Sequence, residues 1–183
     1  MGVAIPGFNT VFWIAPANFL NGSAAMLDSV SGIAMAYLST YSRVIYASRW
    51  AEPDRSPARM LADILSSAGR NNDAAAVTGF LLYREGWFLQ ALEGDLDAVD
   101  LTFDRIRRDR RHHDVRIVAD EPAFERAFPD WAMGAGHLGE VPEAVLAALG
   151  LSANFDPARL DPTKAMALLT AAADARRSLG RAA

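Results

Sequence analysis

The sequence contains no cysteine. A disulfide framework, a thiolate nucleophile, a cysteine-ligated zinc ion and an iron–sulfur cluster are therefore excluded, and this composition fits a reducing cytoplasm. Histidine is also scarce, since only three occur among 183 residues, a thin supply for metal chemistry or a catalytic triad. The net charge of −4 argues against nucleic acid as a default partner. We expect a cytoplasmic protein that binds neither metal nor nucleic acid.

Long apolar runs are missing as well. The first forty residues are apolar and rich in small side chains, but polar residues and prolines interrupt them at Pro6, Pro16, Asn18, Asn21 and Asp28. No apolar run of about 18–20 residues remains for a membrane span, and no basic region precedes the stretch as in a secretory signal. We expect residues 1–40 to be an unassigned N-terminal extension without a membrane role, either poorly structured or partly docked, or a stretch upstream of the true start.

The composition still allows a real core. Hydrophobic residues make up 51% of the chain and charged residues 22%, as in an ordinary globular domain with appendages. Strands are indicated wherever apolar residues alternate or form short runs. The predicted strands cover residues 42–48, a hairpin over 76–94, residues 115–120 and residues 128–136. The hairpin has its tight turn at Arg84-Glu85-Gly86.

Two helices are indicated between these strands by apolar residues at helical spacing. The first begins at Ser56-Pro57 and ends near Gly69, before the predicted loop Asn71-Asn72-Asp73. The second begins with Asp95 or Asp97 as its cap and ends in the charged run 105–114, where the helix dipole favours arginine. Strands and helices therefore alternate in the order β-α-β-β-α-β-β.

This order predicts an α+β, ferredoxin-like fold, with the two helices on one face of the sheet. Two further helices are predicted over residues 141–150 and 161–179. The hairpin is apolar on both faces, with Phe88 and Leu92 on one and Trp87, Leu89 and Ala91 on the other. Both faces must therefore be covered, the second by the C-terminal helices or by another subunit. Because those helices are alanine-rich and offer limited bulk, we also expect a homo-oligomer.

One polar residue interrupts the apolar run of the hairpin. Gln90 shares a face with Phe88 and Leu92, because successive side chains of a strand alternate between faces. Its amide is therefore expected to be buried, and a buried amide without hydrogen-bond partners costs about 1–3 kcal/mol. Tyr46 and Ser48 lie on one face of the first strand, which can neighbour the strand of Gln90 in this topology.

Other polar residues follow the predicted helices. Each has an ordinary structural interpretation: Tyr46 as a core tyrosine, Asn71 and Asn72 as turn residues, and the arginine run as a solvated helix end. His112 and His113 are adjacent, so they cannot both face one metal ion, and no metal site is predicted. Taken singly, none of these residues points to one function.

Taken together, five blocks within residues 42–138 resemble the BLUF family of flavin-using blue-light sensors. The blocks are VIYAS with Tyr46, RNN at 70–72, VTGFLLYREGWFLQALEG with Gln90, DRRHH at 109–113 and RAFPDWAMG with Trp131 and Met133. The resemblance implies a flavin-binding domain over 41–138 and a C-terminal helical extension over 139–183. No output domain is recognisable after residue 138, so the chain resembles the short, stand-alone type.

The resemblance also implies a flavin, FAD with FMN or riboflavin as alternatives, between the two helices that pack on the sheet. Tyr46 would then donate an electron and a proton to the excited flavin, and Gln90 would bridge Tyr46 and the N5/O4 edge of the ring. An amide suits that edge because it offers both a donor and an acceptor. By rotation or tautomerisation, Gln90 would exchange the two and act as the switch.

The remaining site residues come from the same resemblance. Asn72 would bond the carbonyl and imide edge of the ring, with Asn71 beside it. Arg111 would reach the opposite carbonyl, and Asp109 the ribityl chain. Trp131 and Met133 alternate on the predicted last strand, whose position would shift with the signalling state.

The function expected is that of a photoreceptor without enzymatic turnover, which passes its signal through the last strand and C-terminal helices to a separate effector protein. The alternative is a light-independent, ferredoxin-like regulatory module or small hydrolase that lacks flavin. The buried pair of Tyr46 and Gln90 favours the photoreceptor, since such hydrolysis needs no phenol–amide relay.

Overall fold

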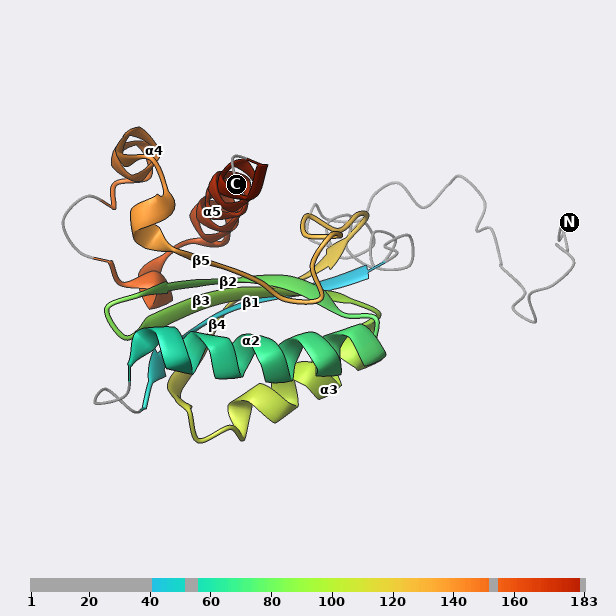
Figure 1. Ribbon diagram of the computed structural model, residues 1–183. Helices are drawn as coiled ribbons and strands as arrows, with labels where there is room; N and C mark the ends of the chain where they lie inside the picture. The colour runs from blue at the N-terminus through green and yellow to red at the C-terminus, as the bar shows by residue number, and fades with distance from the viewer. Residues whose placement is uncertain (1–40, 52–55, 152–154, 182–183) are drawn as a thin grey trace, which may run out of the picture. The chain divides into compact units, whose positions relative to one another are not determined.

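The computed structural model describes residues 41–51, 56–151 and 155–181, so the extension predicted over residues 1–40 lies outside the described residues. In the part described, the strands form one sheet in the order β4-β1-β3-β2-β5. The strands are β1 (Tyr41–Trp50), β2 (Thr78–Arg84), β3 (Trp87–Gly94), β4 (His112–Ala123) and β5 (Gly134–His137). Figure 1 shows this sheet between two layers of helices.

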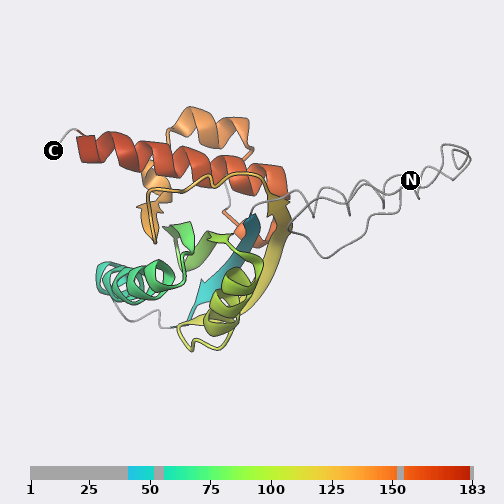
Figure 2. The same ribbon diagram turned by 90° about the vertical axis from the view of Figure 1, so that its right-hand side faces the viewer.

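The helices lie on both faces of the sheet. On one face lie α2 (Pro57–Ala74) and α3 (Leu96–Arg107), and on the other α4 (Glu143–Ala148) and α5 (Pro162–Arg181). Two short 3-10 turns, η1 (Leu138–Glu140) and η2 (Pro157–Arg159), precede α4 and α5. Figure 2 shows the same two layers after a quarter turn, with α5 crossing the sheet opposite α2 and α3. The predicted α+β, ferredoxin-like architecture is therefore confirmed.

The hairpin fixes the register of the central strands. Glu85 and Gly86 form a two-residue turn in which both have positive φ, 49° and 79°, as a hairpin turn that matches the twist of its strands requires. Strand β3 then pairs antiparallel with β1, and Tyr46 lies directly opposite Gln90. The predicted turn and the predicted proximity of this pair are both confirmed.

Both faces of the hairpin are buried, as predicted. Phe88 and Leu92 pack below α2 and α3, whereas Leu89 and Ala91 share a core with α5 residues such as Leu168. Leu89 is fully buried, so the expectation that the C-terminal helices leave it poorly covered was wrong. Alanines of α5 are buried in this core too, because their small side chains let the helix lie close to the sheet.

The first helix is longer than predicted. It continues to Ala74, so Asn71-Asn72-Asp73 form its last turn and not a loop. The helix ends at Ala75 and Ala76, whose backbone N–H groups bond to carbonyls of residues 71–73, and Ala76 takes the positive φ of 52°. Ser56 and Asp95 occupy the cap positions of α2 and α3, but neither side chain bonds to the helix backbone.

The last two strands also differ from the prediction. Strand β4 is longer than 115–120 and begins at His112. Strand β5 covers only Gly134–His137, so Trp131 and Met133 lie in the connector before it and not on it. Pro129 has no N–H for a sheet ladder, and the N–H of Phe128 donates to the carboxylate of Glu93 at 3.0 Å.

Among the described helices, none has the length and apolar character that crossing a membrane requires.

Candidate functional site: a cleft between two helices and the sheet

A cleft lies between α2, α3 and the underlying strands. Residues predicted from the resemblance line it together: Tyr46, Asn71, Asn72, Gln90, Asp109, Arg111 and Met133. Apolar side chains of both helices, such as Ile64 and Ile106, complete the walls. Trp131 does not line the cleft and packs instead with the core on the α5 side. The arrangement is an apolar slot with a few convergent polar groups, the usual form of a small-molecule site.

The buried amide of Gln90 finds both of its partners inside the protein. The hydroxyl of Tyr46 donates to Gln90 Oε1 at 2.5 Å, and Gln90 Nε2 donates to the sulfur of Met133 at 3.4 Å. Tyr46 is fully buried and Gln90 is 3% exposed, so water does not compete for these bonds. A phenol and an amide on adjacent central strands are thus joined directly in the floor of the cleft.

Burial also fixes the protonation of the phenol. It raises the pKa of Tyr46 far above its ordinary value, and the negative charge of Asp109 raises it further. The ring packs against Phe103 of α3, with centroids 5.2 Å apart. Tyr46 is therefore a neutral hydrogen-bond donor in the resting protein, with its proton directed at Gln90.

Asn72 and Asn71 line the cleft from the last turn of α2. Asn72 is 2% exposed, and its Nδ2 donates to the backbone carbonyl of Ala132 at 2.9 Å. Asn71 lines the cleft but is exposed at its rim. The extension of α2 through these residues thus brings Asn72 against the connector that carries Met133.

Asp109 and Arg111 line the same cleft and form an ion pair. Arg111 donates from Nε and Nη2 to Asp109 Oδ2 at 2.9 and 2.5 Å, and from its backbone N to Oδ1 at 2.9 Å. Burial alone would raise the pKa of Asp109, but the hydrogen bonds and charge of Arg111 outweigh it and lower the pKa below its ordinary value. The carboxylate therefore stays ionised beside the guanidinium.

His112 also lines the cleft, although the sequence did not predict it as a site residue. Its Nδ1 lies 2.9 Å from the hydroxyl of Ser48, and its ring lies 5.0 Å from that of Phe88. Burial lowers the pKa of His112 to about 4, with the charge of Arg111 adding to the effect against that of Asp109, so the ring is neutral at pH 7. A strand beginning at residue 112 would have revealed it, but the preceding arginine run suggested a helix end.

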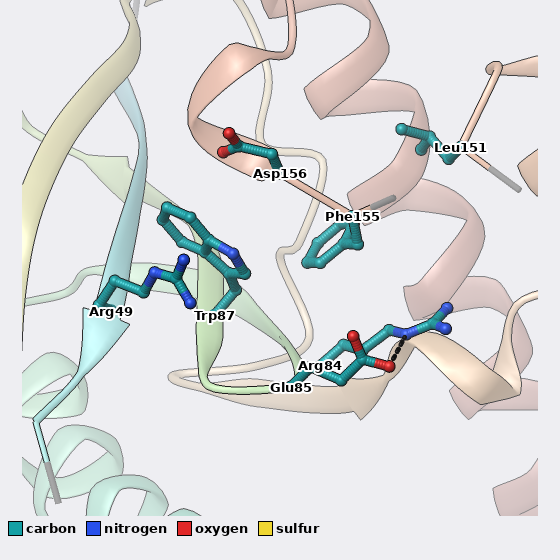
Figure 3. A pocket seen from close by; sticks show the side chains of 7 residues that line it. All are labelled: Arg49, Arg84, Glu85, Trp87, Leu151, Phe155 and Asp156. Atoms are coloured by element: carbon teal, nitrogen blue, oxygen red, sulfur yellow. Dashed lines mark hydrogen bonds and ion pairs between the residues drawn. The ribbon is translucent and has the colours of Figure 1, made fainter. Parts of the chain in front are cut away.

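A second hollow lies at the turn of the hairpin, and none of the predicted site residues lines it. Figure 3 shows its lining: Arg49, Arg84, Glu85, Trp87, Leu151, Phe155 and Asp156. The guanidinium of Arg49 lies 4.0 Å from the centroid of the Trp87 ring, and Arg84 pairs with Glu85 at 3.1 Å. In this hollow the arginine and carboxylate charges balance, and Arg49 and Arg84 have partners in Trp87 and Glu85. The cleft between the helices differs because its polar side chains include the buried Asn72 and Gln90.

Among the described residues, no cluster of three or more acidic or histidine side chains could hold a metal ion.

Comparison with known proteins agrees with this geometry. The profile of the family described as "BLUF: Sensors of blue-light using FAD" matches residues 41–134, about half of the chain. The chain belongs to the BLUF family. It is 33% identical over 99 residues to the photoactivated adenylate cyclase subunit alpha of Euglena gracilis, of which it covers only 10%. The chain thus spans about a tenth of the length of the curated BLUF relatives it matches.

Solved BLUF structures match over more of their length. The chain is similar to BlsA in its photo-activated state, with 27% identity and a TM-score of 0.65 over 73% of this chain and 94% of that one. It is also similar to the dark-state BLUF protein BlrB, with 29% identity and a TM-score of 0.60 over 75% and 98% of the two chains. These matches extend beyond the BLUF domain itself and agree with the short, stand-alone type.

The cleft fits the flavin that a BLUF domain binds. A flavin ring presents carbonyl acceptors and an imide donor at its edges, which require partners of both kinds. The cleft supplies both, through the amides of Asn72 and Gln90, the guanidinium of Arg111 and the phenol of Tyr46. Ile64 and Ile106 add apolar side chains to the lining of the same cleft, as the faces of such a ring would require.

Proposed function

We propose that this BLUF photoreceptor responds to blue light by proton movement between Tyr46 and Gln90, and that no catalytic turnover takes place. The observation that carries the proposal is the buried hydrogen bond from the Tyr46 hydroxyl to Gln90 Oε1. When bound, the flavin, FAD with FMN or riboflavin as alternatives, would supply light absorption and the redox partner of Tyr46. Tyr46 would give up an electron and its Oη proton; that proton would pass along the bond to Gln90 Oε1, and the amide would give up one Nε2 proton in its place.

Gln90 is proposed to be the switch because its two ends have different partners. In the structure Oε1 accepts from Tyr46, and Nε2 donates to the Met133 sulfur. A half-turn of the amide, or its tautomerisation, exchanges donor and acceptor. Methionine has no hydrogen to donate, so an amide oxygen turned toward Met133 leaves the sulfur without its hydrogen bond. The switch therefore releases Met133 and leaves the backbone of β3 in place.

The other cleft residues are proposed to hold and orient the ring. Asn72 would bond its carbonyl and imide edge with Asn71 beside it, Arg111 the opposite carbonyl, and Asp109 the ribityl chain. What supports this is their convergence on one cleft and the buried position of Asn72. Arg111 and Asp109 also bond to each other, so each charge is neutralised by the other within the cleft.

The output is proposed to run through residues 131–137 and the C-terminal helices to a separate effector protein, with Trp131 and Met133 as the relay. Self-association into homo-oligomers is proposed as well. Exposed apolar side chains on the described surface support such contacts, among them Leu101 of α3, 67% exposed, and Ile117 of the edge strand β4, 55% exposed.

The test compares absorption spectra of flavin-loaded wild type, Tyr46→Phe, Gln90→Leu and a control, Tyr83→Phe. Blue light should shift the flavin band of wild type slightly to the red, with recovery in the dark. Tyr46→Phe and Gln90→Leu should bind flavin but lose the shift, since each removes one end of the relay while keeping most of the packed volume. Tyr83→Phe makes the same chemical change at another buried tyrosine of the sheet, outside the cleft, and should keep the shift.

A full reversible shift in Tyr46→Phe would show that the proposed relay is wrong even if the flavin is bound. Protein that stays colourless after addition of FAD, FMN or riboflavin would instead support the light-independent ferredoxin-like module or hydrolase.

A further inference from the structure

The connector before β5 contacts the layers on both faces of the sheet. Met133 packs with Tyr46 and Phe88 in the cores below α2 and α3, and its sulfur accepts the bond from Gln90. Two residues earlier, Trp131 packs with the core on the α5 side. The backbone between them is held by Asn72, which donates to the carbonyl of Ala132, and by Gly79, whose N–H donates to the carbonyl of Trp131 at 3.1 Å.

Trp131 lies between the sheet and the last turns of α5. Its ring contacts that of Phe80, with centroids 5.3 Å apart, and the guanidinium of Arg177 lies over the Trp131 ring at 4.4 Å from its centroid. Arg177 also pairs with Asp130 at 3.6 Å and with Asp174 at 2.9 Å. Two of these three partners, Trp131 and Asp130, belong to the connector, whereas Asp174 belongs to α5 itself.

We propose that Arg177 is the positioning residue through which α5 responds to Gln90. The inference rests on the proposed function, because it requires that Gln90 release Met133 in light. A displacement of Met133 then passes to Trp131 through Ala132, the single residue between them, and works against the bonds that Asn72 and Gly79 donate to this backbone. Arg177 then loses Trp131 and Asp130 together and keeps only Asp174. The last turns of α5 are attached to the connector in the dark and detached from it in light.

The neighbouring residue, Arg176, makes it possible to separate the contact between Arg177 and the connector from the positive charge of the helix. Arg176 pairs with Glu140 of η1 at 3.7 Å, outside residues 130–133. Its side chain is 54% exposed, against 27% for Arg177. Removing either arginine deletes one positive charge from the same helical turn. Of the two, Arg177 contacts Trp131 and Asp130 of the connector, whereas Arg176 pairs with Glu140, so Arg176→Gln is a matched control for Arg177→Gln.

The experiment measures amide hydrogen exchange of the flavin-loaded full chain in the dark and under continuous blue light, together with the flavin spectrum. In wild type and Arg176→Gln, light should speed exchange of residues 174–181 by about 2–5-fold, the range that loss of one partly exposed cation–π contact corresponds to. In Arg177→Gln, exchange should be fast in both conditions and the light-dependent difference should vanish, while the red shift persists. Trp131→Leu should give the same result as Arg177→Gln. The double variant Trp131→Leu/Arg177→Gln should exchange no faster than either single variant.

Each other outcome has a definite meaning. A wild-type red shift without a light-dependent change in residues 174–181 would overturn the inference and leave the proposed photochemistry standing. The inference would also be overturned if Arg177→Gln kept the wild-type light-dependent change in exchange, or if Arg176→Gln lost that change to the same extent. Loss of the red shift in Arg177→Gln would also overturn it, because the residue would then act on the switch and not on its readout. A wild type with bound flavin but no red shift would contradict the proposed function itself.

Discussion

Replacing Glu93 by glutamine should destabilise the protein far more than an ordinary loss of one surface charge. Glu93 is fully buried at the end of β3, and its carboxylate accepts hydrogen bonds from three donors. Arg43 Nε donates to Oε1 at 2.7 Å, and the backbone N–H groups of Ala127 and Phe128 donate to the two oxygens at 3.1 and 3.0 Å. An amide in either orientation turns its NH₂ group toward one of these donors.

The expected magnitude follows from what remains bonded after the change. Breaking a buried ion pair by altering one partner costs about 3–5 kcal/mol. Here Arg43 keeps a contact with Glu121 at 3.4 Å and with the carbonyl of Glu125 at 3.2 Å, and glutamine keeps one acceptor oxygen. We therefore expect a loss of about 2–3 kcal/mol in the free energy of unfolding, out of the roughly 5–15 kcal/mol typical of a domain.

The assay is urea unfolding of flavin-loaded wild type, Glu93→Gln and Glu121→Gln, with hydrogen exchange at the amides of Ala127 and Phe128. Glu121 bonds the same arginine but its side chain is 42% exposed, so Glu121→Gln should cost less than about 1 kcal/mol. Exchange at Ala127 and Phe128 should accelerate only in Glu93→Gln. A Glu93→Gln protein as stable as Glu121→Gln, with slow exchange at both amides, would refute the reasoning.

Two further predictions concern packing and pH. Gly79→Ala should destabilise the protein by about 1–3 kcal/mol or more in urea unfolding, because the new Cβ would overlap the carbonyl oxygen of Ala91. Gly69→Ala is the control, because a Cβ at this helical site would have nothing within 4 Å. It should be neutral or stabilising by up to about 1 kcal/mol. His112 binds a proton near pH 6.5 when unfolded but only near pH 4 when folded, so the stability it confers is complete above about pH 6.5 and is lost as pH falls toward 4. Between pH 7.5 and 5.5, wild type should therefore lose about 1 kcal/mol more than His112→Gln, and equal losses would contradict the assigned shift.

The features that the sequence predicted well depend on neighbours along the chain. Alternation within the hairpin identified the buried face of Gln90, and the predicted topology allowed its strand to lie beside that of Tyr46, where the structure pairs them. The role of each cleft residue toward flavin came from the family resemblance, because no local pattern specifies it.

The features that were mispredicted depend on contacts between distant residues. The asparagines after Arg70 have turn-forming composition, yet Asn72 remains helical, and its amide bonds to a carbonyl 60 residues away. The last strand was predicted to begin at Phe128, but the N–H of Phe128 donates to the carboxylate of Glu93, 35 residues away, and the strand begins at Gly134. Periodicity within a short window carries no information on either contact.

The central position of the Tyr46–Gln90 pair has a consequence for how the protein is made. The hairpin of β2 and β3 closes across a two-residue turn, but Tyr46 and Gln90 are 44 residues apart, so β1 must dock on the hairpin before they meet. The cleft is therefore complete only once β1 has docked, and we expect flavin to bind the folded chain. Such a ligand draws the folding equilibrium toward the native state in proportion to its supply. Cells short of flavin should accordingly hold less of this receptor, through proteolysis of the unfolded chain.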